Sequence, residues 1–159
     1  MNRLRIFASL RLGAALLALW LPLAASAEPN HPALRSLLPL LEVFGAGREI
    51  PSYDVAGLRC AGLRLAQADW ATQTPDIAGP SAAEMAEADL MLEASEQQRL
   101  NEGMDLARAH VSIERDARRI WRLYGRRFAG NVRKGGHPWA EDRLVTGDMG
   151  FCERLGRRG

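Results

Sequence analysis

The stretch YDVAGLRCAGLRLAQADW, residues 53–70, decides the expected fold. Its apolar and small side chains form two stripes that cover most of a helix circumference, and Ser52 or Asp54 can open the helix. A helix with so few polar positions is typical of the centre of a bundle, where several neighbours bury it. Gly57 and Gly62 lower helix propensity, but they allow another backbone to approach closely.

Helices are also expected on both sides of this stretch. Residues 30–44 form a short apolar segment in which Pro39 causes a kink or a division into two pieces. Ser81 and Glu84 have the spacing of a capping box and precede a run rich in alanine, methionine and leucine. The sequence leaves open whether residues 82–132 form one long helix or two.

The second half of that region has the clearest helical period in the chain. Apolar residues recur there at three- and four-residue steps, namely Met104, Ala107, Val111, Ala117, Trp121, Tyr124 and Phe128. A last short helix is expected from Asp148 to Leu155. No segment alternates as a strand does, so the sequence predicts an all-α fold, a bundle of four or five helices.

Residues 1–27 have the three parts of a cleavable signal peptide. Three arginines are followed by an apolar stretch of about a dozen residues, which is shorter than a spanning helix needs. Small residues then precede Glu28, and cleavage is expected between Ala27 and Glu28. The mature protein would be one domain, residues 28–159, located in a periplasm or secreted.

Export changes the interpretation of charge and of the cysteines. Three of the 21 basic residues but none of the 19 acidic ones lie in the leader, so the mature chain has a net charge of about −1. With a net charge so close to zero, the mature chain has no overall positive field that would attract nucleic acid. We therefore do not expect nucleic acid as a partner. In an oxidising compartment Cys60 and Cys152 most simply form one disulfide, the alternatives being free or intermolecular thiols.

No residue pattern specifies a catalytic reaction, a metal site or a cofactor. His110 and Glu114 share a helix face but lack further ligands, while His31 and His137 are expected to be exposed. No nucleophile elbow occurs, and Glu141 and Asp142 are carboxylate neighbours whose side chains would diverge. The sequence therefore predicts a protein that is not an enzyme, although an unrecognised enzyme remains an alternative.

The strongest local feature is the basic segment at residues 115–128. Its arginines are Arg115, Arg118, Arg119, Arg122, Arg126 and Arg127. The aromatic stripe of Trp121, Tyr124 and Phe128 is expected to face the core, leaving the arginines in solvent or paired with the acidic helix before them. The alternative is that this basic helix contacts an anionic partner or the surface of an anionic membrane.

Two segments around the cysteines, residues 58–63 (LRCAGL) and 151–155 (FCERL), resemble small exported two-cysteine helical proteins of proteobacteria that have no known activity. The likeness covers about a quarter of the mature chain and implies a compartment and a two-cysteine helical fold. Taken together, the sequence predicts a non-catalytic periplasmic binding or interaction protein whose partner is another protein or an envelope component. Peripheral attachment to an anionic membrane is the second hypothesis.

Overall fold

The computed structural model describes residues 32–44 and 53–157, which form helices connected by turns and loops. The helices are α1 (Pro32–Arg35), α2 (Leu40–Phe44), α3 (Tyr53–Gln73), α4 (Ala82–Asn101), α5 (Leu106–Arg133) and α6 (Arg143–Gly156). No strand occurs within these ranges. The all-α bundle is therefore confirmed, with four long helices and two helices of about one turn. The predicted leader, residues 1–27, and the predicted starts at Asn30 and Ser52 lie outside the described residues.

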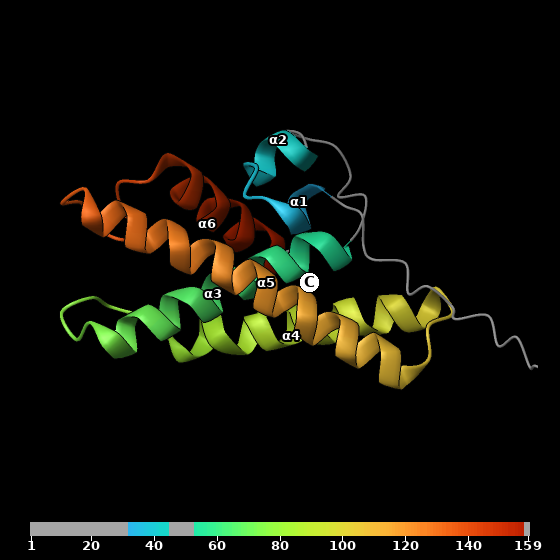
Figure 1. Ribbon diagram of the computed structural model, residues 1–159. Coiled ribbons are helices and arrows are strands. Elements are labelled where there is room, and N and C mark those ends of the chain that lie inside the picture. The colour runs from blue at the N-terminus through green and yellow to red at the C-terminus, as the bar shows by residue number, and fades with distance from the viewer. Residues whose placement is uncertain (1–31, 45–52, 158–159) are drawn as a thin grey trace, which may run out of the picture.

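Helix α3 is the centre of the bundle, as its pattern predicts. It contacts α1, α4, α5 and α6, and every residue from 55 to 64 is buried. Figure 1 shows α4 along one side of α3, α6 and α2 on the other, and α5 crossing in front. Full burial of a leucine such as Leu58 or Leu63 contributes about 1.5–3 kcal/mol.

The two glycines of α3 lie where its neighbours approach most closely. A Cβ added at Gly62 would lie 2.6 Å from Cγ2 of Ile120 on α5. One added at Gly57 would lie 3.1 Å from Oγ of Ser95 and 3.2 Å from the carbonyl oxygen of Met91, both on α4. The expected close approach of a second backbone is thus confirmed on two sides of α3.

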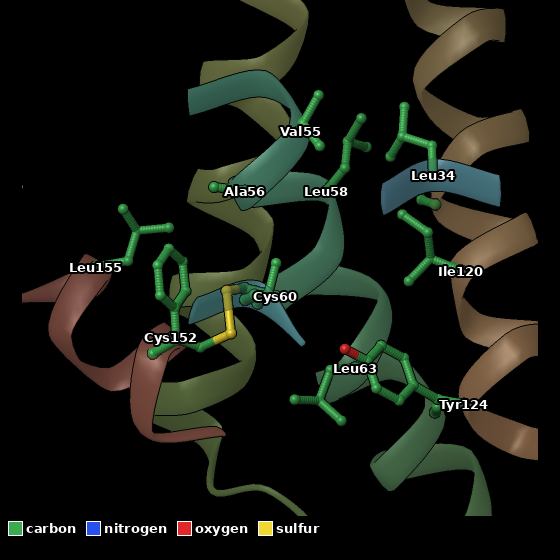
Figure 2. Close-up of a cluster of buried hydrophobic side chains, with 14 of the residues drawn as sticks. Leu34, Val55, Ala56, Leu58, Cys60, Leu63, Ile120, Tyr124, Cys152 and Leu155 are labelled. Carbon is green, nitrogen blue, oxygen red and sulfur yellow. A yellow bond between two sulfur atoms is a disulfide. The ribbon is translucent and has the colours of Figure 1, made fainter. Parts of the chain in front are cut away.

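Cys60 and Cys152 form the predicted disulfide, with a Cα–Cα distance of 5.5 Å. Both side chains are buried, and Figure 2 shows the bond in the core between α3 and α6, beside Leu155. The bond ties the central helix to the last one across 92 positions of sequence. The disulfide therefore fixes the C-terminal helix α6 to α3 at the centre of the bundle.

The apolar N-terminal segment forms two short helices, as one of the two alternatives at Pro39 predicted. The carbonyl of Pro39 accepts hydrogen bonds from the N–H groups of Glu42 and Val43, so this proline begins α2 instead of kinking a single helix. Leu40 is fully buried, and Phe44 stacks on Phe151 of α6 with ring centroids 5.8 Å apart. The segment therefore covers one end of the α3–α6 contact.

The region from 82 to 132 contains two helices, which answers the question that the sequence leaves open. The capping box is confirmed, because the Ser81 hydroxyl accepts from the N–H of Glu84 and the Glu84 carboxylate accepts from that of Ser81. Helix α4 ends before Gly103, whose φ of +92° favours glycine, and the Asp105 side chain caps the start of α5. This tight turn places α5 antiparallel to α4 (Figure 1).

Two details of the predicted helices are wrong. Ala107 and Val111 are exposed, and the buried face of α5 instead includes Ile113, Asp116 and Ile120. The pattern failed there because steps of three and four residues through Ala107 and Val111 turn away from the face of Tyr124, whereas Ala109 and Ile113 lie on that face. The last helix begins at Arg143, not at Asp148, because the Asp142 carboxylate caps it by accepting from the N–H groups of Leu144 and Val145.

Across the described ranges, no helix is both long enough and apolar enough to cross a lipid bilayer.

Candidate functional site

Helix α5 has an apolar face that packs in the core and an opposite, exposed face that carries arginines. Tyr124 and Phe128 are fully buried and Trp121 is half-buried, which confirms that the aromatic stripe faces the core. The opposite face carries exposed arginines, which we call the arginine row: Arg115, Arg118, Arg119, Arg122 and Arg126. At 1.5 Å per residue the row extends about 16 Å along the helix.

The arginine row has little compensating charge around it. Arg115 lies 3.2 Å from Asp116, and Arg118 lies 4.0 Å from Glu114. Arg122 and Arg126 form no ion pair with any residue that the structure describes. Asp116 is 1% exposed and also binds Arg99 of α4, so its charge is directed inward. The row is therefore a local cationic surface on a nearly neutral protein.

The sixth predicted residue, Arg127, does not belong to this surface. Its guanidinium binds the Asp142 carboxylate through two hydrogen bonds, Nε–Oδ2 at 2.6 Å and Nη2–Oδ1 at 2.9 Å. Burial acts to raise the pKa of Asp142, but hydrogen bonds from Arg127, Asn131 and the Val145 N–H outweigh it and lower the pKa to about 2. Arg127 therefore connects α5 to the start of α6. Arg133, which the sequence analysis missed, extends the row by seven residues beyond Arg126.

A buried polar network lies behind the row, on the inner face of α5. Arg59 of α3 contacts Asp148 of α6 at 2.6 Å, and the Tyr124 hydroxyl donates to the same Asp148 oxygen at 2.6 Å. Arg59 also donates to the carbonyls of Ser36 and Leu38. Burial raises the pKa of Tyr124 far above its ordinary value, so the phenol stays protonated and acts as a donor.

A second buried network holds α4 against α3 and α5. Arg99 of α4 contacts Asp54 at the start of α3 and Asp116 of α5, with Nη2 3.2 Å and 2.9 Å from the two carboxylates. Its Nη1 also donates to the Ser112 hydroxyl at 2.6 Å. Desolvation raises the pKa of Asp54, and Arg99 opposes this shift. Each charged group has a partner of opposite sign. The two networks therefore hold α5, which carries the arginine row, against α3, α4 and α6.

These networks were not anticipated, although the sequence contains a signal for them. Arg59 and Arg64 interrupt an otherwise apolar helix, and both are buried, at 0% and 4% exposure. Arg64 binds Glu84 at 2.8 Å, so it connects α3 to the capping box of α4. Arginines on a helix that is apolar on all sides therefore mark buried ion pairs.

The histidines have local partners. His110 lies 3.2 Å from Glu96 and 3.6 Å from Glu114, and the ring of His137 accepts hydrogen bonds from the N–H groups of Trp139 and Ala140. Residues 32–44 and 53–157 contain no group of three or more histidine, cysteine, aspartate or glutamate side chains that could hold a metal ion. His31 lies outside these ranges, and Glu141 is exposed near Gly136.

A shallow groove of about 400 Å³ lies between α4 and α5, with α3 as its floor. Leu65 and Asp69 of α3, Leu92 of α4 and, on α5, Glu114, Ala117, Arg118 and Trp121 line it. The lining is mainly apolar, and Arg118 belongs to both the groove and the arginine row. The groove and the row are therefore adjoining parts of one surface.

Comparison with models of protein families, with curated protein sequences and with solved structures finds no match for this chain. The resemblance of residues 58–63 and 151–155 to exported two-cysteine proteins stays a prediction.

Proposed function

We propose that the protein is an exported, non-catalytic binding protein that attaches to an anionic partner through the arginine row of α5. The observation that carries this proposal is the row itself, in which Arg122 and Arg126 have no ion pair among the described residues. Unpaired guanidinium groups on one helix face bind carboxylates or phosphates through charge-assisted hydrogen bonds. The partner we favour is an acidic surface of another envelope protein.

The helix that presents the row is well held. Its inner face contains Tyr124 and Asp116, each bound to a buried arginine on another helix, and Arg127 fixes its C-terminal half to α6. A rigid row loses less side-chain and backbone freedom on binding than a mobile one, which favours affinity. Two features therefore support the proposal: the positive charge of the arginine row, and the buried contacts that hold α5 in place beneath it.

Attachment to an anionic membrane surface is the second candidate. The observation that favours it is that the five exposed arginines share one face of α5 over about 16 Å, so that they can approach a flat surface together. Because Tyr124 and Phe128 are buried in the core, such contact would depend on charge and not on inserted aromatic rings. Each arginine near an anionic membrane contributes about 1 kcal/mol.

Export is part of the proposal, with cleavage between Ala27 and Glu28 and release into a periplasm or the exterior. It is supported by the composition of residues 1–27 and by the disulfide, because disulfides persist in oxidising compartments. Mass spectrometry of the protein recovered from the envelope fraction should give an N-terminal peptide that begins at Glu28. An intact N-terminus in that fraction would contradict cleavage.

The binding proposal is tested with two probes. The mature protein is titrated with poly-glutamate, as a substitute for an acidic protein surface, and with vesicles that contain phosphatidylglycerol. We expect binding that weakens as salt is added, because exposed charges are screened. Binding to the polymer favours an acidic protein partner, and binding to vesicles alone favours the membrane. Binding to neither probe would refute the proposal.

A further inference from the structure

The groove between α4 and α5 has apolar side chains on an otherwise charged face. Trp121 of α5 and Leu92 of α4 line it and are half-buried. Each of these side chains leaves apolar surface in water that a partner could cover. The charges around the groove indicate which partner fits.

Acidic and basic side chains are separated across this face. On α4, Asp89, Glu93 and Glu96 are spaced to share one side of the helix. Glu96 reaches His110 at 3.2 Å, which shows that this side borders α5. The one basic residue of α4, Arg99, is buried. The α4 edge of the groove is therefore acidic. On the α5 edge Arg118 and Arg122 are basic, while Glu114, 4.0 Å from Arg118 and 3.6 Å from His110, is acidic.

The acidic and basic residues also lie at matching levels. The contacts of Glu96 with His110, and of Arg99 with Ser112 and Asp116, set the register of α4 against the antiparallel α5 to within about one turn, with Arg99–Ser112 in the middle of the range (Figure 1). Six residues back along α4 and six forward along α5 place Glu93 level with Arg118. Ten residues in each direction place Asp89 level with Arg122. Both helices rise 1.5 Å per residue, so the levels correspond along the groove.

We propose that this face binds a second copy of the chain, related by a two-fold axis that runs along the groove. Such an axis places α4 of one copy over α5 of the other and keeps the levels unchanged. Glu93 then meets Arg118 of the other copy and Asp89 meets its Arg122, and each pair occurs twice. A two-fold axis perpendicular to the helices would place acidic α4 on acidic α4. The charges therefore select the first arrangement.

This dimer buries Trp121 and Leu92 near its axis, surrounded by four ion pairs. It uses Arg118 and Arg122 at the α5 edge of the groove and leaves Arg119 and Arg126, which lie further round α5, on the outside. Because the dimer pairs Arg118 and Arg122, an anionic partner would compete with it for these two side chains. The two proposals can still fail separately, since one is tested by self-association and the other by binding of added polyanions.

Sedimentation of the mature protein over a range of concentrations tests the dimer. We expect a monomer–dimer equilibrium whose dissociation constant rises with salt. Glu93→Arg and Arg118→Glu should each raise that constant at least about tenfold, because each change replaces two attractive pairs with two repulsive ones. The double variant Glu93→Arg/Arg118→Glu should restore association close to the wild-type level.

The matched control is Arg126→Glu, which makes the same charge change on α5 away from the groove and should leave the dimer intact. Circular dichroism checks that each variant is folded, and Asp89→Arg with Arg122→Asp provides a second charge swap. A protein that stays monomeric at every concentration and salt would overturn the proposal. So would a double variant that associates no better than the single ones, or a control that weakens association equally.

Discussion

Arg59 and Asp148 form an ion pair of 2.6 Å in the core, with side chains 0% and 1% exposed. The pair lies beside the disulfide in sequence, since Arg59 precedes Cys60 and Asp148 is four residues before Cys152. The Leu40 N–H donates to the second Asp148 oxygen at 2.8 Å, so the pair also fixes the N-terminal segment. One junction therefore joins α2, α3, α5 and α6.

Removing one partner of this pair should destabilise the protein strongly. Asp148→Asn leaves the Arg59 guanidinium buried without an opposing charge, and we expect a loss of about 3–5 kcal/mol in the free energy of unfolding. Urea denaturation of the mature protein measures it. Asp76→Asn, on an exposed loop, serves as the control and should change stability by less than about 0.5 kcal/mol. A loss below about 1 kcal/mol at Asp148 would show that the pair does not brace the fold.

The disulfide should be both stabilising and protected. Its closed loop spans 92 positions, for which the chain-entropy model gives about 4–5 kcal/mol as an upper figure. Because Cys60 and Cys152 are 1% and 2% exposed, we expect a mild reductant to act slowly on the folded protein and quickly in denaturant. Mass spectrometry after alkylation measures the two rates. Equal rates would contradict the buried bond.

The close approach of α3 and α5 predicts opposite effects for two glycine substitutions. Gly62→Ala should destabilise by about 1–3 kcal/mol, since the new Cβ would lie 2.6 Å from Ile120. Ile120→Val in the same chain should not relieve the clash, because valine keeps Cγ2, whereas Ile120→Ala should relieve it in part. Gly125→Ala on α5 has no atom within 4 Å and should stabilise by about 0.5–1 kcal/mol. Because Ile120 is fully buried, each Ile120 substitution is also made alone, and the relief is read as the coupling between the two sites in thermal unfolding. No coupling between Gly62→Ala and Ile120→Ala would contradict the clash.

The lowered pKa of Asp142 predicts a specific loss of stability in acid. Its folded-state pKa of about 2 lies below the ordinary value of 3.8, so its contribution is fully present above about pH 4 and is lost as the pH falls toward 2. Asp142→Asn should remove that part of the pH dependence. It keeps a side chain that can cap α6, but it loses the charge of the pair with Arg127, so we expect a loss of about 1 kcal/mol at neutral pH. Urea midpoints between pH 2 and 7 measure both effects. Parallel pH curves for wild type and variant would contradict this role.

Much of the fold could be predicted because its signals are local. The apolar circumference of α3, the capping box at Ser81 and the lone cysteine pair each indicate one structural feature without knowledge of the rest. The first half of the α5 core face could not be placed correctly, because two apolar series overlap there, one through Ala107 and Val111 and one through Ala109 and Ile113, and packing against the other helices buries the second. The start of α6 was missed for a related reason, since Asp142 acts both as its cap and as a partner of Arg127.

In the candidate site, too, some features follow from the sequence of one helix and others depend on how the helices pack. The exposed arginines of α5 follow from its helical period, whereas the pairing of Arg127 with Asp142 and the groove beside Trp121 depend on how the helices pack. A segment can show that a charged residue is buried, as Arg59 does on α3, but it does not show which residue of another helix is its partner. A sequence can therefore indicate which helix carries the charge, and the packing decides which of its arginines are left for a partner.

The central claim is that the arginine row binds an anionic partner, and a comparison of two charge-matched variants tests it most directly. Arg122→Gln/Arg126→Gln removes two positive charges from the row, and Arg143→Gln/Arg154→Gln removes two exposed ones from α6. Titration with poly-glutamate and with phosphatidylglycerol vesicles should show the row variant weakened about thirtyfold toward the probe that wild type binds, at about 1 kcal/mol per arginine. The α6 variant should bind as wild type does. Equal weakening of both variants, or no binding by wild type to either probe, would contradict the claim.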